Sequence, residues 1–228
     1  MEWVIDDWSP LWISLKTAIP ATVVAFFLGI AAAYLVVRMK HGKNIVDAVF
    51  MLPLVLPPTV IGFLLITAFS KYSDLGTFLL DHGIRIVNSQ IGVTIAITIV
   101  AFPLMYRAVR GSLESFDENM TNAARTLGMS EAAVLGKVII PNILPGLVSG
   151  AVLAFARALG EYGAAMMIGG SISGKTVTMS IAVGMEYITD RDLAYCWTII
   201  LIGMAATVVV LMNWFNQKQM NATGGGRH

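Results

Sequence analysis

Long apolar segments alternate with short polar ones along most of the chain. The five continuous apolar stretches cover residues 11–37, 48–69, 91–106, 138–168 and 193–215. A helix needs roughly 20 apolar residues to cross the hydrocarbon core of a bilayer, so most stretches are long enough and 91–106 is short but usable. The pattern predicts an all-α, polytopic transmembrane helical bundle with five to six spans, forming a single membrane domain over residues 1–228.

Two segments depart from the pattern of straight spans. The run Val177–Ile188 has only about half the length of a span, and we interpret it as a re-entrant or surface helix on the external side. The run Leu52–Pro58 contains three prolines, which cannot all continue a regular helix. We therefore expect the second span to be kinked there, either for packing alone or for a role in transport.

The composition supports lipid as the solvent of this chain. Hydrophobic residues make up 57% and charged residues 13%, where soluble domains have about 45–50% and 25%. The net charge of +1, without a Lys/Arg tract, gives no reason to expect nucleic acid. A single cysteine, Cys196, excludes an intrachain disulfide, and the three scattered histidines suggest no metal cluster. No cofactor is expected in this chain.

Cationic residues are unevenly distributed between the two sets of loops. Segments 38–44, 107–137 and 216–228 together hold nine Lys and Arg, whereas segments 1–10, 69–90 and 169–192 hold four. Because Lys and Arg concentrate in cytoplasmic loops, the first set is expected in the cytoplasm. The N-terminus is then outside and the C-terminus inside, with a disordered tail expected over about 217–228.

The sequence GGSISGKT at Gly169–Thr176 matches the phosphate-loop pattern G-x-x-x-x-G-K-[ST]. A phosphate loop also needs a buried strand before it, a helix after it and a second strand that ends in an acidic residue. Here a membrane helix precedes the loop, and the charge distribution places it outside. We interpret it as a flexible Gly/Ser loop, which leaves a membrane-tethered ATP-binding enzyme as a minor alternative.

The central cytoplasmic loop, about 111–137, predicts two short amphipathic helices. Ser115–Glu118 matches a capping box, and Gly128 is a plausible left-handed stop for the first helix. Ser130 can cap a second helix that runs to about Lys137. The two helices would form a compact knob suited to the groove of a partner protein.

In this loop the chain resembles the permease subunits of ABC importers. Their cytoplasmic signature reads Glu-Ala-Ala, three residues, Gly, nine residues and Ile-x-Leu-Pro. Here Asn122-Ala123-Ala124 is followed by three residues, Gly128, nine residues and Val138-Ile-Ile-Pro141. Asn122 replaces the acidic residue, and Val138 and Ile140 are conservative replacements. A literal Glu131-Ala132-Ala133 nearby is out of register with both the glycine and the proline.

The resemblance covers nearly the whole chain and is closest to molybdate permeases, with sulfate permeases as longer relatives. The stretches most similar to that subfamily are Leu52-Pro-Leu-Val-Leu-Pro-Pro58, Phe102-Pro-Leu-Met105, Ala123-Ala-Arg-Thr-Leu-Gly128 and Leu153-Ala-Phe-Ala-Arg-Ala-Leu-Gly-Glu-Tyr-Gly163. The resemblance implies a multi-pass subunit of the cytoplasmic membrane, embedded in lipid, that does not hydrolyse ATP itself. The residues it assigns to ATPase coupling are Asn122, Ala123, Ala124, Arg125, Gly128, Val138 and Pro141.

The partners that the resemblance implies are a second copy of the chain, a cytoplasmic ABC ATPase subunit and an external oxyanion-binding protein. The expected substrate is molybdate or tungstate, with a sulfate-type oxyanion as the alternative. An ion-coupled secondary transporter is less favoured, because such transporters show internal repeats and intramembrane carboxylates. We detect no repeat, and Glu161 is the one carboxylate that the sequence places well inside a span.

Arg157 and Glu161 lie four residues apart in the fourth apolar stretch, on one face of a helix. Ionisable residues in a span are costly and normally face a partner, the bundle interior or water. The two residues can form a mutually neutralising pair. Alternatively, Arg157 can line the path that an anion takes across the membrane and lower the energy barrier for it. Gly146 and Gly150 in the same stretch form a G-x-x-x-G pair that would let another helix approach closely.

Overall fold

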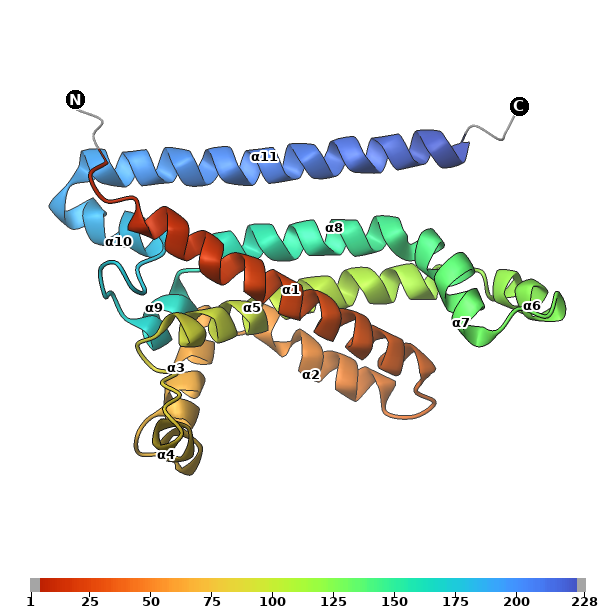
Figure 1. Cartoon of the computed structure of the whole chain (residues 1–228), viewed down its shortest axis with the longest axis horizontal. Coiled ribbons are helices and arrows are strands. Elements are labelled where there is room, and N and C mark those ends of the chain that lie inside the picture. Colours follow the sequence, from red (N-terminus) through yellow and green to blue (C-terminus); the bar gives the residue numbers. More distant parts are fainter. Residues whose placement is uncertain (1–4, 225–228) are drawn as a thin grey trace.

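The computed structural model describes the backbone of residues 5–224 and the side chains of residues 5–214 and 217. In this part of the chain the regular structure is entirely helical (Figure 1). The elements are α1 (Ser9–Arg38), α2 (Lys43–Val55), α3 (Pro58–Phe69), α4 (Asp74–Asp81), α5 (Gln90–Glu114), α6 (Glu118–Thr126), α7 (Glu131–Val134), the π-helical turn η1 (Leu135–Ile139), α8 (Ile140–Leu159), α9 (Gly163–Gly169), α10 (Met179–Thr189) and α11 (Arg191–Gly224).

Four continuous helices are long and apolar enough to cross a membrane: α1, α5, the helix Glu131–Leu159 and α11. The pair α2 and α3 passes the same test together but is bent by 104°, which gives up to five spans. The all-α, polytopic architecture predicted from the sequence is confirmed. α10 has 11 residues, too few for a sixth span, and lies at the same end of the bundle as the N-terminus (Figure 1).

The expected kink in the second span is a full break. Leu56 and Pro57 have extended backbone, with ψ of 143° and 132°, and Pro58 starts the next helix. A residue before proline is pushed out of the helical region, so two consecutive prolines end α2. Pro53, by contrast, remains inside α2.

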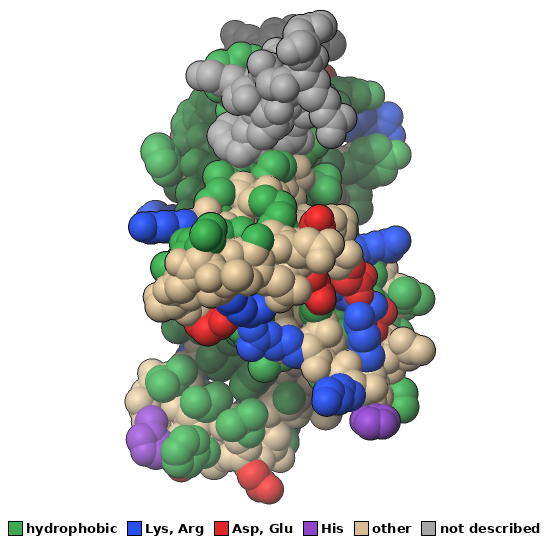
Figure 2. All heavy atoms as spheres, turned by 90° about the vertical axis from the view of Figure 1, so that its right-hand side faces the viewer, with side chains coloured by type: hydrophobic (Ala, Val, Ile, Leu, Met, Phe, Trp, Pro, Cys, Tyr) green, Lys and Arg blue, Asp and Glu red, His purple; other side chains and the backbone are tan. Residues whose placement is uncertain are grey.

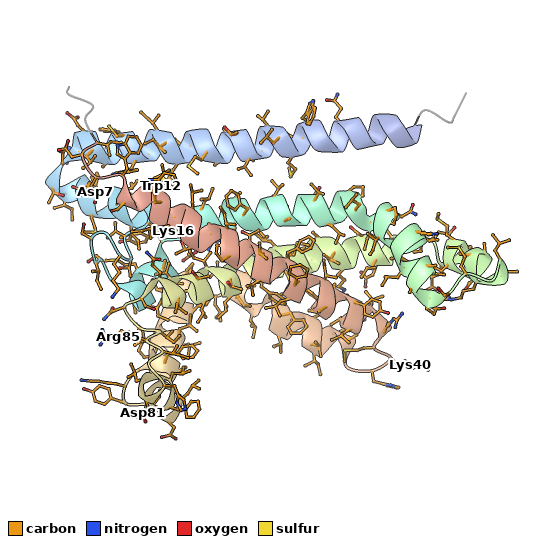
Figure 3. All side chains as sticks on the ribbon, in the orientation of Figure 1. Asp7, Trp12, Lys16, Lys40, Asp81 and Arg85 are labelled. Carbon is orange, nitrogen blue, oxygen red and sulfur yellow. The ribbon has the colours of Figure 1, made fainter. Side chains whose placement is uncertain are left out.

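The loops sort to the two ends of the bundle as the charge distribution predicts. The α1–α2 connection and α6–α7 lie at one end, and the N-terminus, α9 and α10 lie at the other (Figure 1). Lys40 lies at the first end, whereas Asp7 and Arg85 lie at the opposite one (Figure 3). Viewed from the first end, Lys, Arg, Asp and Glu side chains gather over the surface (Figure 2).

α5 is the central helix, in contact with α1, α2, α8 and α9. Its neighbours approach it through small residues. A methyl group on Gly29 of α1 would lie 2.7 Å from Met105 Cγ, and one on Gly150 of α8 would lie 2.7 Å from Ala108 Cβ. The G-x-x-x-G pair therefore packs against α5, as predicted, because without a hydrophobic driving force membrane helices associate through close backbone contact.

The C-terminal helix is longer than expected. The backbone of α11 stays helical to Gly224, where the sequence suggested disorder from 217, and residues 225–228 lie outside the described part. Residues 215–222 contain neither Gly nor Pro, so a helix already formed in the span propagates through them.

Gly150→Val should separate α5 from α8, because the added methyl groups would overlap Ala108 and Met105. We expect a cost of about 1–3 kcal/mol or more in the free energy of unfolding. Gly203→Val is the matched control, because nothing lies within 4 Å of the added Cβ. Unfolding in detergent, followed by circular dichroism, measures both variants. Equal destabilisation by the two would show that the α5–α8 contact is not a close one.

Candidate functional site

α6 begins two residues later than the sequence suggests. Its N-cap is Asp117, whose Oδ1 accepts a hydrogen bond from Asn119 N at 2.9 Å. Ser115 instead ends α5, with its N–H bonded to the Gly111 carbonyl at 3.0 Å. The predicted capping box at Ser115 is therefore wrong, because the last turn of α5 uses that residue first.

The predicted stop at Gly128 has the geometry of a Schellman motif. Gly128 has φ of +79°, its N–H donates to Arg125 O at 2.9 Å, and Met129 N donates to Ala124 O at 3.1 Å. Ala124 is buried, whereas Ala123 is exposed and Leu127 is 82% exposed. The turn therefore directs the apolar side chain of Leu127, at the end of α6, away from the bundle.

Ser130 caps the following helix as predicted, with its Oγ accepting from Ala133 N at 3.3 Å. The second helix does not end near Lys137, however. It continues through η1 into α8 as one helix, Glu131–Leu159. Pro141 lies in the first turn of α8, directly after the wide π-helical turn, which accommodates its missing N–H and its ring.

Arg125 connects the two sides of this turn. Its Nε and Nη2 donate to the two carboxylate oxygens of Glu131 at 2.6 and 3.1 Å, and Nη1 donates to Asn122 Oδ1 at 3.3 Å. The Glu131 carboxylate raises the pKa of the Arg125 guanidinium. Glu131, out of register with the family signature, therefore binds the same guanidinium as Asn122, which stands where the signature has an acidic residue.

The structure brings the predicted coupling residues to one end of the bundle. Asn122, Ala123, Ala124, Arg125 and Gly128 belong to α6 and its terminal turn, whereas Val138 lies in η1 and Pro141 in α8. A cavity of 300 Å³ lies under α6, between the ends of α1 and α5. Its lining includes Tyr34, Arg38, Phe116, Asn122, Arg125 and Ile139.

Arg157 and Glu161 form the predicted mutual pair, with Nη1 and Oε2 2.6 Å apart. They do not share a helix, because α8 ends at Leu159 and Glu161 lies in the break before α9. Glu161 is 1% exposed, and its Oε1 accepts from Ala164 N at 2.8 Å. Its carbonyl oxygen accepts from Ser180 Oγ at 2.7 Å. Glu161 thus joins α8 to α9 through its carboxylate and to α10 through its backbone carbonyl, while the Arg157 side chain remains 30% exposed.

A second charge network, which the sequence interpretation missed, connects α2 to α5 at the opposite end of the bundle. Arg110 pairs with Asp47 and, at 3.1 Å, with Glu114, and Lys43 Nζ lies 2.6 Å from Glu114 Oε1. The fully buried Tyr106 donates its hydroxyl to Asp47 Oδ1 at 2.9 Å. Asp47, Tyr106, Arg110 and Glu114 also line a cavity of 430 Å³. In the sequence, Asp47 could have indicated this network, because it is the one charged residue in the apolar segment 44–69.

The loop that matches a phosphate-loop pattern lacks the required context. It follows the seven-residue α9 rather than a strand, and the next helix starts only at Met179. The hydroxyl of Thr176 is buried, accepts from Ile172 N at 3.0 Å and donates to Gly170 O at 3.4 Å. The side chain that would hold a metal ion in a phosphate loop is therefore engaged by the loop itself.

Sequence comparison gives the family of the chain. Residues 25–220 match the family described as "Binding-protein-dependent transport system inner membrane component". The chain belongs to this family. It is thus an inner-membrane, multi-pass permease component of an ABC importer, which works with an ATPase subunit and a periplasmic binding protein and does not itself hydrolyse ATP. This assignment excludes both the secondary transporter and the tethered ATP-binding enzyme.

Individual relatives match over most of the chain. The molybdenum transport system permease protein ModB of Escherichia coli K12 is 40% identical, covering 90% of this chain and 91% of that protein. ModB of Haemophilus influenzae Rd is 35% identical, covering 94% and 95%. The probable sulfate transport system permease protein cysT of Chlorokybus atmophyticus is 34% identical, covering 75% and 60%.

Solved structures share the fold at low sequence identity. The MetNI methionine ABC transporter in an inward-facing conformation has a TM-score of 0.72 and 16% identity, covering 92% of this chain and 94% of that one. A bacterial ABC transporter for alginate import has a TM-score of 0.75 and 13% identity, covering 92% and 78%. The helical arrangement described above is therefore that of an ABC importer permease.

Gly128→Val should loosen the Schellman turn between α6 and α7, because a β-branched residue at positive φ costs on the order of 1 kcal/mol or more. We expect weaker co-purification of the ATPase subunit and unchanged membrane insertion. Gly136→Val is the matched control, since both glycines have open space around the added Cβ and only Gly128 has positive φ. Equal ATPase recovery with both variants would mean that the left-handed turn is not needed for docking.

Proposed function

We propose that this chain conducts molybdate, or the similar tetrahedral dianion tungstate, as a homodimer. The observation that carries the proposal is the 40% identity to the Escherichia coli molybdenum permease over nearly the full length of both chains. The relative named for sulfate transport is 34% identical, and this chain covers only 60% of it. Sulfate is therefore the second candidate substrate.

The coupling segment, residues 118–128, is proposed to dock into a groove of the ATPase subunit. Leu127 and Met120 are 82% and 44% exposed, although they lie on a polar helix at the charged end of the bundle. Burial of such apolar side chains in a partner's groove is the usual mode of helix recognition. The Schellman turn and the Arg125–Glu131 pair preserve the shape of the segment for this contact.

The end of the bundle that carries the coupling segment is proposed to face the cytoplasm, with the N-terminus outside. Segments 38–44 and 107–137 at this end hold seven Lys and Arg, whereas segments 69–90 and 169–192 at the opposite end hold four, which supports this orientation. With Cys196 replaced by serine, single cysteines at positions 125 and 175 can be labelled in intact cells with an impermeant reagent. We expect labelling at 175 only. The reverse pattern would invert the topology.

Selection of the substrate is proposed to reside mainly in the binding protein. Arg157 is a partly exposed cation in the last turn of α8, and one of its guanidinium nitrogens is engaged by Glu161. A selective oxyanion site needs several directed donors, whereas conduction needs weak binding. Arg157 is therefore assigned a transient attraction for the anion along the path.

ATP-driven uptake into proteoliposomes containing the permease, ATPase and binding protein tests the function. We expect labelled molybdate to accumulate only with all three components, and excess tungstate to compete better than sulfate. Preferential uptake of sulfate would instead support the second candidate.

Arg157→Ala should slow uptake without changing the order of oxyanion preference. It also leaves Glu161 buried without its cation, at a cost of about 3 kcal/mol or more in stability. The double variant Arg157→Met/Glu161→Gln removes both charges and therefore separates transport from folding. A changed order of preference in the stable double variant would show that the permease itself selects the anion.

A further inference from the structure

A cavity of 320 Å³, lined by both polar and apolar side chains, lies outside the regions assigned above, at the end of the bundle that carries the N-terminus. It is formed by the end of α3, by α4 and by the segment that leads into α5. α3 and α4 project from the side of the bundle as a lobe (Figure 1). The lining residues are Phe69, Ser70, Lys71, Leu80, Arg85, Ile86, Val87 and Asn88.

Two cations line this cavity, and no carboxylate does. Within residues 5–214, none of the ion pairs involves Lys71 or Arg85. The Lys71 ammonium lies over the ring of Tyr72, 5.0 Å from the ring centroid. Asp81, at the end of α4, lies farther out on the lobe than Arg85 (Figure 3). The cavity therefore has an unbalanced positive charge.

Two neutral donors complement the cations. The Ser70 hydroxyl accepts from Tyr72 N at 3.3 Å, so its own proton is free to be donated. Asn88 is held in the left-handed region with φ of 57°, and its N–H donates to Ile168 O of α9 at 2.8 Å. An ammonium, a guanidinium, a hydroxyl and an amide together are the donors that bind a tetrahedral oxyanion.

A second cavity at the same end of the bundle has the opposite charge. Its volume is 260 Å³, and its lining includes the four carboxylates of Asp6, Asp7, Glu186 and Asp190. Clefts lined by one sign of charge concentrate ions of the opposite sign. This end of the bundle therefore repels anions beside α10 and attracts them to the α3–α4 lobe.

We propose that the cavity of Lys71 and Arg85 is an anion-binding site that takes a tetrahedral oxyanion at the outer face of the permease. It would hold the ion between its release by the binding protein and its entry into the path. Only the choice of molybdate as the anion rests on the proposed function. The binding chemistry itself would also accept sulfate.

Equilibrium binding of labelled molybdate to the permease–ATPase complex in lipid nanodiscs, without binding protein or ATP, tests this site. We expect saturable binding that weakens as salt is added, because the charges are exposed to solvent. Lys71→Met/Arg85→Met should weaken binding about tenfold or more, since two charge-assisted contacts are lost. The same measurement with labelled sulfate keeps the test independent of the transported substrate.

Two controls make the result specific. Lys175→Met/Arg191→Met removes two cations from the same end outside the cavity, and Lys71→Arg/Arg85→Lys keeps both charges. Both should bind as the wild type does, and the exchange variant remains informative if the neutral variant fails to fold. Wild-type binding by Lys71→Met/Arg85→Met, or no saturable binding of either anion by the wild type, would overturn the proposal.

Uptake in the complete system distinguishes the remaining explanations. If the neutral variant binds molybdate normally but needs more binding protein for uptake, the two cations contact that protein, and the proposal is wrong. If the wild type binds an oxyanion in this cavity but does not import molybdate, the proposed function fails while the site stands.

Discussion

The close approach of α1 and α8 to α5 is the constraint on which the rest of the structure depends. In lipid, helices gain little from burying apolar side chains, so packing requires small residues that bring the backbones together. Gly29, Gly146 and Gly150 provide these contacts on two sides of α5, and a row of fully buried alanines extends them along α1. The exposed charges at the bundle ends and the broken second span are arranged around this central contact.

Because α8 is fixed on α5, the two functional ends of the molecule are linked by one helix. The helix Glu131–Leu159 begins at the Schellman turn of the coupling segment and ends beside Glu161. There the buried carboxylate of Glu161 joins α8 to α9, and the backbone carbonyl of the same residue accepts a hydrogen bond from Ser180 of α10. A displacement imposed by an ATPase on α6 would thus reach the break between α8 and α9, where Glu161 binds Arg157. The Asp47–Arg110 pair connects α2 to the central helix α5.

The sequence was informative where the determining interactions are local. Apolar length located the spans, Gly128 and Ser130 were correctly placed in the coupling turn, and the pairing of Arg157 with Glu161 follows from their spacing of four. Interactions between distant segments were missed. Asp47 and Arg110 meet only when α2 folds against α5, and Glu131 was set aside because it is out of register with a motif, although the turn at Gly128 brings it to Arg125. Ser115 was misassigned because two helices compete for the same few residues, and hydrogen bonding to α5 prevails.

The coupling segment and α8 are expected to move as one unit across η1, whereas a π-helical turn that acted as a hinge would let them move separately. Pulsed EPR between spin labels at positions 127 and 144 tests this expectation in the assembled transporter. The background is Cys196→Ser, and labelled chains are diluted in unlabelled ones so that distances within one chain are measured. We expect the same distance in the nucleotide-free and ATP-trapped states. A change on the order of one helical turn, about 5 Å, would show that the segment moves independently of α8 and would contradict this account.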